Sequence, residues 1–134
     1  MKYILALVLL CLVSCKQTFV KSGTGLAGVS HQWKLKGMKS GCLFMAACCI
    51  GGLGTDAEML SARAWAVKKG YIRDSDTYVN MSAQALAQKI ASNYGTTYHR
   101  NWSAKKGCGH FWVVDQNGKE VFNAAGLGYS GCHK

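Results

Sequence analysis

The chain has 134 residues, of which 49% are hydrophobic and 16% are charged, with 16 Gly, 7 Cys and no Pro. This length is typical of one domain with its own core, and the high apolar content excludes collagen-like, coiled-coil and disordered chains. Sixteen Lys and Arg against six Asp and Glu give a formal net charge of +10, which favours attraction to anionic lipids or wall polymers.

The N-terminal segment is typical of an export signal. Lys2 is followed by an apolar run over residues 3–13, which is too short to span a membrane but matches the apolar part of a secretory signal. Residues 12–15 are Leu-Val-Ser-Cys, which resembles the bacterial lipobox, in which the cysteine carries the lipid. We expect a lipoprotein-type signal peptide over residues 1–14 and lipidation at Cys15; the alternative is a plain signal peptide in which this cysteine is incidental.

Residues 15–28 contain Lys, Thr, Ser and Gly and few large apolar side chains, so a flexible tether is expected before a domain over residues 29–134. The first predicted element of that domain covers residues 42–50, with the sequence CLFMAACCI. A buried strand could have this composition, but Met, Leu and two Ala favour a buried helix.

Capping residues predict two further helices. Thr55 followed by Glu58 matches a capping box, and apolar residues then recur at helical spacing up to Gly70. Ser82 is expected to cap the next helix, which ends at Gly95.

The remaining pattern predicts strands. A short strand is expected at residues 77–79, and three more at 96–102, 109–115 and 119–124, because these segments contain β-branched and aromatic residues. Asn-Gly at 117–118 is a strong hairpin signal and joins the last two strands antiparallel. Helices first and an antiparallel sheet afterwards indicate an α+β domain.

Cys42 is a candidate nucleophile because of its place in the chain. It stands at the predicted start of a buried helix, where unpaired N–H groups and the helix dipole stabilise an anion. Lys36 and Lys39 add positive charge, and both effects favour the thiolate, the nucleophilic form. The alternative is a buried structural thiol, which is the simplest interpretation of Cys48 and Cys49.

A thiolate needs a base, usually a histidine. Of the four histidines, His110 is best placed, because it begins a predicted apolar strand. The hairpin register pairs residues whose numbers sum to about 235, which brings His110 near Asn123. The Asn123 side-chain oxygen could hold the imidazole in one tautomer, as the third member of a triad does. Asp115 is the alternative third residue, although it lies beside the turn.

These residues resemble the papain-like cysteine peptidases, and among them the bacterial group that cuts double-glycine leader peptides, with its stand-alone relatives. The resemblance rests on Gly41-Cys42 at the start of a small-residue helix, on Gly-His-Phe-Trp-Val-Val at 109–114, and on Asn123. It implies a papain-like fold, with N-terminal helices packed on a C-terminal antiparallel sheet. It also implies Cys42 as nucleophile, His110 as base and Asn123 as the residue that orients the imidazole.

In this family a Gln upstream of the cysteine completes the oxyanion hole. The usual position holds Lys36 here, and Gln32 lies further upstream, so the resemblance assigns the oxyanion to Gln32 and the Cys42 N–H. The chain also departs from the family at Asn123-Ala124, where Asp-Pro is usual, and at Leu43, where a small residue is usual. Similarity to the cell-wall NlpC-type peptidases is looser, because their Asp-Cys-Ser-Gly sequence is absent.

Cys108 and Cys132 flank the last strands and are a possible disulfide. With His110 and His133 they could also form a zinc site, but the spacings C-x-H and C-H are unlike the usual ligand pairs. We therefore expect no metal and no cofactor.

The leading functional hypothesis is an exported, lipid-anchored cysteine hydrolase of the cell envelope. It would cleave a peptide or amide bond in a peptide or protein substrate and contact the membrane through its lipid. No nucleic-acid partner is expected, because the lysines are scattered and no Arg-aromatic module is present. Two alternatives remain: a non-catalytic envelope lipoprotein that uses the same fold for binding, and a small basic secreted antibacterial or lysis protein.

Overall fold

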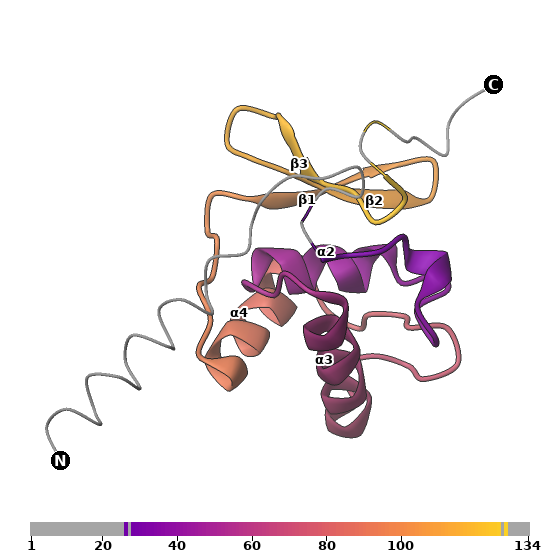
Figure 1. Cartoon of the computed structure of the whole chain (residues 1–134). Coiled ribbons are helices and arrows are strands. Elements are labelled where there is room, and N and C mark those ends of the chain that lie inside the picture. The colour runs from indigo at the N-terminus through magenta and orange to yellow at the C-terminus, as the bar shows by residue number, and fades with distance from the viewer. Residues whose placement is uncertain (1–25, 27, 127, 129–134) are drawn as a thin grey trace, which may run out of the picture.

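A computed structural model describes residue 26, residues 28–126 and residue 128 of the chain (Figure 1). The described part is mixed α+β, with three α-helices and a small three-stranded antiparallel sheet in the order β1-β2-β3. The helices precede the strands, as predicted. The elements are the 3-10 helix η1 (Gln32–Lys34), the helices α2 (Cys42–Ile50), α3 (Asp56–Lys69) and α4 (Ala83–Tyr94), and the strands β1 (Ser103–Gly107), β2 (His110–Val114) and β3 (Glu120–Phe122).

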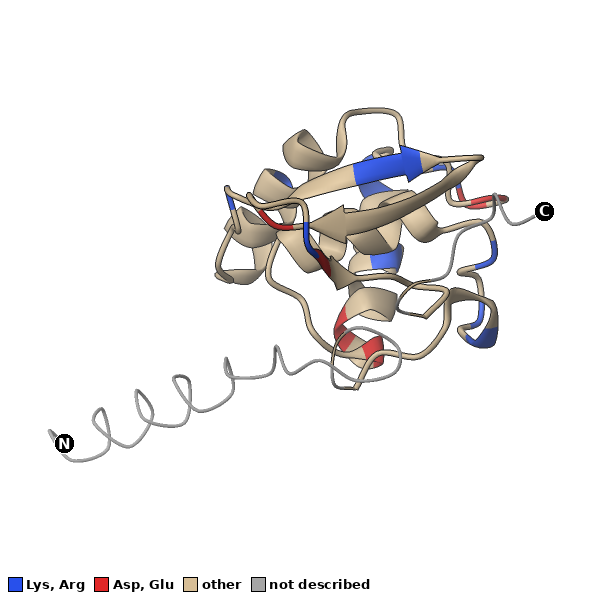
Figure 2. Cartoon of the chain, turned by 90° about the horizontal axis from the view of Figure 1, so that it is seen from above, with Lys and Arg blue, Asp and Glu red and all other residues tan. Residues whose placement is uncertain are grey.

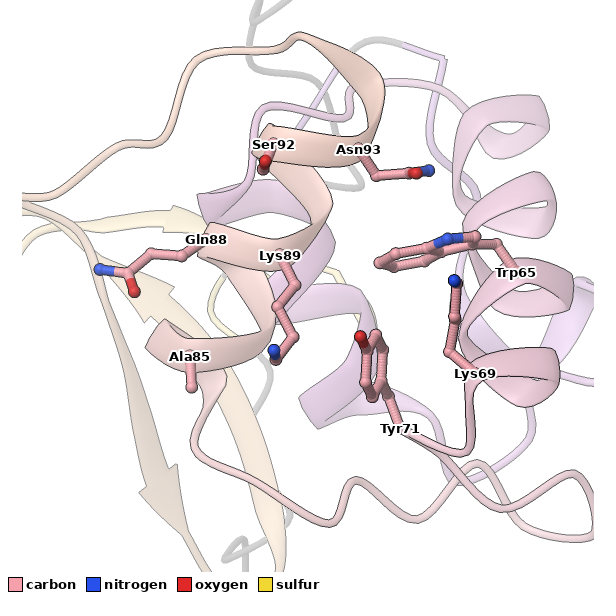
Figure 3. A pocket seen from close by; sticks show the side chains of 8 residues that line it. All are labelled: Trp65, Lys69, Tyr71, Ala85, Gln88, Lys89, Ser92 and Asn93. Atoms are coloured by element: carbon pink, nitrogen blue, oxygen red, sulfur yellow. The ribbon is translucent and has the colours of Figure 1, made fainter.

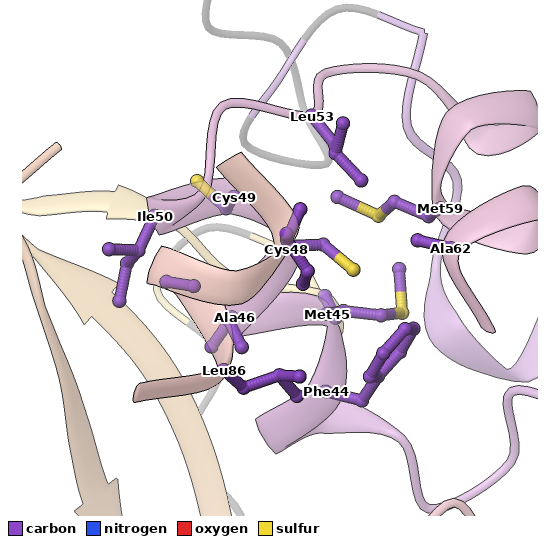
Figure 4. Close-up of a cluster of buried hydrophobic side chains, with 14 of the residues drawn as sticks. Phe44, Met45, Ala46, Cys48, Cys49, Ile50, Leu53, Met59, Ala62 and Leu86 are labelled. Atoms are coloured by element: carbon purple, nitrogen blue, oxygen red, sulfur yellow. The ribbon is translucent and has the colours of Figure 1, made fainter. Parts of the chain in front are cut away.

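Helix α2 lies at the centre of the domain. The sheet packs on one side of it, and α3 and α4 pack on the other (Figure 1). Every residue of α2 except Leu43 is buried, which confirms the predicted buried helix. Figure 4 shows its side chains meeting those of the neighbouring elements, among them Met59 and Ala62 of α3 and Leu86 of α4. One apolar helix therefore holds both layers together.

Helices α3 and α4 begin and end as predicted. The Thr55 hydroxyl accepts a hydrogen bond from the Glu58 N–H at 3.2 Å, and Ser82 caps α4 in the same way. The Glu58 carboxylate accepts from the Thr55 hydroxyl and from the backbone N–H one residue earlier. Gly70 and Gly95 follow the two helices in the left-handed conformation, with φ of 77° and 66°, which is the usual helix stop.

The connection between α3 and α4 contains less strand than expected. Within residues 77–79 the structure has only an isolated bridge, between Val79 and Ile72. Thr77 explains the difference, because its φ of 58° is incompatible with a strand. Its buried hydroxyl instead donates to the carbonyl of Gly37 at 3.0 Å and accepts from Arg63. The connection thereby packs against the segment that leads into α2.

The strand predicted at residues 96–102 is wrong. These residues are irregular, and β1 begins at Ser103. The reason lies at the end of α2, where the His99 N–H donates to the Ile50 carbonyl at 2.7 Å and the Thr96 hydroxyl donates to the Gly51 carbonyl at 2.6 Å. The segment uses its polar groups to close the helix end and is unavailable for strand pairing.

The β2–β3 hairpin forms as predicted, but with a different turn. Its loop has three residues, 116–118, and is closed by a bond from the Asp115 N–H to the Lys119 carbonyl. The two-residue Asn-Gly turn expected there does not form. Val114 pairs with Glu120, whereas Val113 pairs with Phe122, so a bulge lies between the two pairs. The bulge restores the expected register, in which the paired residue numbers sum to 235.

The signal peptide over residues 1–14, Cys15 and most of the tether lie outside the described residues. Leu26, near the end of that tether, is buried and belongs to the core. Among the helices in the described ranges, none has the length and apolar character needed to cross a membrane.

Candidate active site

His110 is placed by the tight turn between β1 and β2. Gly107 pairs with His110, which leaves Cys108 and Gly109 as a two-residue loop. Both have positive φ, 47° and 79°, as in the type I′ turns that suit antiparallel hairpins. Cys108 is disulfide-bonded; Cys132, its predicted partner, lies outside the described residues. His110 is consequently fixed at the first position of β2.

The His110 ring meets Asn123 in the interior of the domain. The distance from His110 Nε2 to Asn123 Oδ1 is 2.8 Å, and the two residues are 6% and 0% exposed. The same amide oxygen accepts from the Ala125 N–H at 3.0 Å, while Asn123 Nδ2 donates to Glu120 Oε1 at 3.4 Å. Asn123 is therefore held from both ends, with its oxygen directed at the imidazole.

This contact selects one tautomer of the imidazole. An amide oxygen can only accept a hydrogen bond, so Nε2 of His110 must carry the proton. In the neutral ring Nδ1 is then the nitrogen that can take up a proton, as a general base requires. Trp112, two residues along the same strand face, stacks on the His110 ring with centroids 6.1 Å apart. The ring is thus oriented by one polar and one aromatic neighbour.

Gln32 lies beside the same end of β3. Its backbone N–H donates to the carbonyl of Ala124 at 2.8 Å, one residue after Asn123. Its Oε1 atom is buried and has no hydrogen-bond partner in the described part of the chain. On either side of Gln32, the rings of His31 and Trp33 stack on each other with centroids 4.7 Å apart. The 3-10 helix thus brings this predicted oxyanion residue next to the His110–Asn123 pair.

Cys42 is the first residue of α2 and a free thiol, 8% exposed. The chain enters the helix through Gly41, where a Cβ atom would lie 2.8 Å from the Met38 carbonyl oxygen, so only glycine fits this approach. No hydrogen bond joins the Cys42 thiol to His110 or to any other residue of the described ranges. His110 is thus hydrogen-bonded to Asn123 and not to Cys42.

The relation between α2 and β2 explains this separation. Val113 of β2 packs in the core with α2, and side chains alternate along a strand. His110 therefore lies on the strand face opposite to Val113. Figure 1 shows the β1–β2 turn and the segment that leads into α2 at the same end of the molecule, on the right. Cys42 and His110 thus begin two elements that pack on each other at one end.

The cysteine environments differ along α2. Burial raises the pKa of Cys49 far above its ordinary value, and it does the same for Cys48, where Cys49 and Glu58 add to the effect. Lys36 and Lys39 are exposed beside the start of the helix, and residues 28–55 contain no acid. Asp56 and Glu58 in the first turn of α3 are the first acids among the described residues, and Figure 2 marks the Asp and Glu positions in red. The chain segment that leads into the Cys42 end of α2 therefore carries positive charge and no acid.

Asp115, the alternative third residue, has a different role. Its carboxylate accepts from the N–H groups of Asn117 and Lys119, each at 2.9 Å, and so stabilises the β2–β3 loop. The sequence analysis missed Glu120, whose carboxylate holds Asn123 from the side away from the imidazole. The one indication of this contact in the sequence is that Glu120 lies in the predicted hairpin, three residues before Asn123.

The part of the chain that the structure describes contains no group of three or more His, Cys, Asp or Glu residues placed to hold a metal ion. Comparisons with known proteins add no relationship: no protein-family model matches the chain, and no curated protein or solved structure is significantly similar to it.

Proposed function

We propose that the chain is an exported cysteine hydrolase of papain-like fold that cleaves a peptide or amide bond. The observation that carries the proposal is the buried bond between His110 Nε2 and Asn123 Oδ1. A buried histidine held by an amide oxygen, with its other nitrogen as the acceptor, has the chemistry of a general base. The free Cys42 thiol stands at the start of α2, and the Gln32 N–H bonds to Ala124, the residue that follows Asn123.

The proposed reaction uses only this chain's side chains and water. His110 Nδ1 takes the Cys42 proton, and the sulfur attacks the substrate carbonyl carbon to form a tetrahedral oxyanion. The imidazolium returns the proton to the leaving amine as the C–N bond breaks, which leaves a thioester on Cys42. Water, deprotonated by His110, then attacks the thioester, and the proton returns to the sulfur as the acid leaves.

Two groups of this chain could stabilise the oxyanion. The backbone N–H of Cys42 stands in the first turn of α2, where N–H groups have no partner within the helix. The Gln32 side-chain amide could supply a second donor, because its backbone is anchored to Ala124 beside Asn123. The reaction also needs the Cys42 sulfur to come within hydrogen-bond reach of His110 when substrate binds, a tightening that unliganded enzymes often require.

The proposal includes the cellular setting. Lipidation at Cys15 would anchor the domain to a membrane of the cell envelope through residues 15–28, with peptide or protein substrates. The proposed reaction needs no cofactor, since thiol and imidazole complete each step.

A non-catalytic envelope lipoprotein is the second candidate. Two observations favour it: Cys42 makes no hydrogen bond to His110, and exposed Lys36 stands where the family usually has its oxyanion Gln. In that case the His110–Asn123 bond would be purely structural, as a satisfied buried pair.

The test measures whether Cys42 and His110 act together. Iodoacetamide alkylation of the full chain is followed by peptide mass spectrometry, at about pH 6 and about pH 9. If His110 stabilises the thiolate, wild-type Cys42 reacts at both pH values. His110→Ala should then slow the reaction at least about tenfold at the lower pH and little at the higher. His99→Ala, at the other end of α2, is the matched control and should leave both rates unchanged.

A second measurement addresses catalysis. A peptidyl acyloxymethyl ketone, which requires attack by an activated thiolate, should label the wild-type chain on Cys42 and fail to label Cys42→Ala. Equal pH profiles for wild type and His110→Ala would contradict the proposal and favour the binding protein. Labelling that survives in Cys42→Ala, or that maps to Cys132, would contradict the assignment of the nucleophile.

A further inference from the structure

A second candidate site lies on the other side of α2, between α3 and α4. It is a pocket of about 520 Å³, within the size range of small-molecule sites. Figure 3 shows Trp65 and Lys69 of α3, Tyr71 of the following loop, and Lys89 and Asn93 of α4 pointing toward the same space, while Gln88 points away from it. None of the four residues proposed for catalysis lines the pocket, so it needs a separate explanation.

The aromatic part of this pocket is held in a fixed orientation. Trp65 meets Tyr71 edge-on, with ring centroids 5.4 Å apart, and meets Tyr94 in the same way at 5.8 Å. Trp65 and Tyr71 are only half-buried, although both pack against the core. Part of a rigid aromatic surface is therefore presented to solvent, where it can stack on a ring of matching size.

The charged part of the pocket is positive. Lys69 and Lys89 are both exposed lining residues, and no acid lines the pocket. Neither lysine forms a salt bridge with a described acid. The Lys89 ammonium instead lies 5.0 Å from the centre of the Tyr71 ring, which holds it beside the aromatic surface. An anion that entered the pocket would find two cations without acidic partners.

The third part is a row of neutral polar groups on α4. Gln88, Ser92 and Asn93 line the pocket at helical spacing, with Ala85 at the lower end of the same face. Their amide and hydroxyl groups can both donate and accept hydrogen bonds. All three are exposed, so they are free to turn toward a ligand that carries several hydroxyl groups.

We propose that this pocket binds an acidic saccharide, a sugar ring that carries a carboxylate. The apolar face of the ring would stack on Trp65, the hydroxyls would bond to the polar row on α4, and the carboxylate would lie between Lys69 and Lys89. A small inorganic anion would use only the lysines, and an apolar ligand would leave the polar row unused. The acidic saccharide uses all three parts of the pocket at once.

The experiment compares sugars that differ by one carboxylate group. Binding of N-acetylmuramic acid and N-acetylglucosamine to the full chain is measured by NMR titration, with inorganic phosphate and AMP as further probes. The acid should bind about tenfold more tightly than the neutral sugar, and added salt should reduce the difference. Lys69→Gln and Lys89→Gln should each weaken binding of the acid several-fold and leave binding of the neutral sugar unchanged.

The adjacent Lys68 provides the matched control. It is exposed on α3 but does not line the pocket, so Lys68→Gln should leave both affinities as they are. Trp65→Phe, which keeps an aromatic ring in the core, should weaken the binding of both sugars. Equal affinity for the two sugars, equal effects of Lys68→Gln and Lys69→Gln, or tighter binding of phosphate or AMP would each overturn the proposal. None of these results depends on Cys42 or His110, so the hydrolase proposal is tested separately.

Discussion

The two ends of α2 place the same residue type in opposite environments. Cys42 begins the helix at the edge of the domain and is 8% exposed, whereas Cys48 and Cys49, near its end, are completely buried. Burial raises the pKa of both inner thiols well above the ordinary range, so they behave as apolar core atoms. One short helix can thus supply both a packing surface and a candidate reactive group, according to what surrounds each end.

The ends also differ in how they are closed. At the start, Gly41 allows a close backbone approach, and exposed lysines precede the helix. At the end, the segment 96–99 folds over the last carbonyls and donates hydrogen bonds to Ile50 and Gly51. The closed end is part of the core, while the other end lies at the same end of the molecule as the β1–β2 turn (Figure 1). Four experiments test this difference between the two ends of α2.

The largest expected effect is on thiol reactivity. In the native protein, N-ethylmaleimide should modify Cys42 at least about a thousandfold faster than Cys48 or Cys49, because the inner thiols are buried and stay protonated. Peptide mapping by mass spectrometry after timed quenching gives the three rates, and denatured protein is the control in which they should converge. Comparable native rates would show that the end of α2 opens readily to solvent.

The closed end of α2 should not tolerate a side chain at Gly52. Its φ is 93°, and a Cβ atom would lie 2.6 Å from the Thr97 carbonyl oxygen. Gly52→Ala should therefore lower the free energy of unfolding by about 3 kcal/mol. Gly70→Ala is the control, since Gly70 has a similar φ of 77° with nothing within 4 Å, and should cost about 1 kcal/mol. Urea unfolding of both variants shows whether steric crowding or backbone conformation accounts for most of the stability lost at Gly52.

Asn123→Ala should lower the free energy of unfolding by about 2 kcal/mol, because the buried His110 and Ala125 N–H donors lose their acceptor. The exposed turn residue Asn117 offers the comparison, and Asn117→Ala should change stability by less than about 0.5 kcal/mol. If both variants unfold at the same urea concentration, the His110–Asn123 bond contributes little to the fold.

The smallest effect concerns pH. Burial lowers the pKa of His99, which stacks on Trp102 beside the end of α2. Because the unfolded chain then binds the proton more tightly than the folded one, stability should decrease as the pH falls below about 6.5, the ordinary imidazole value. His99→Phe keeps the ring stack and removes the titration. The melting temperature of this variant should fall less on acidification than that of the wild type. An identical pH dependence of the two melting temperatures would contradict a contribution from His99 titration.

Local signals account for the parts of the fold that were predicted correctly. Thr55, Glu58 and Ser82 cap helices within a few residues of their own position, and Gly70 and Gly95 end them. Each such interaction is complete within one turn of helix, so it is visible in the sequence.

The errors occurred where distant segments decide the structure. Residues 96–102 have strand-forming side chains, yet the His99 N–H donates its hydrogen bond to the end of α2 instead of to a neighbouring strand. The actual strand β1 has the sequence SAKKG, which carries little strand propensity and forms because it pairs with β2.

The candidate site was predictable in part. The hairpin register predicts from the sequence that His110 and Asn123 lie close together, and the predicted helix start gives the position of Cys42. The Glu120 contact and the hydrogen bond from Gln32 to Ala124 depend on side-chain orientation and on a long-range chain crossing, which periodicity does not encode.

The β2–β3 bulge has a consequence for how this hairpin can change. If the Val114–Glu120 pairing continued without it, Val113 would face Val121, and Asn123 would turn to the strand face opposite to His110. The bulge shifts the sum of the paired residue numbers from 234 to 235, which keeps Asn123 on the same strand face as His110. A hairpin closed through Asp115 and Lys119 is thus compatible with the His110–Asn123 contact only because the bulge lies between the closing pair and that contact.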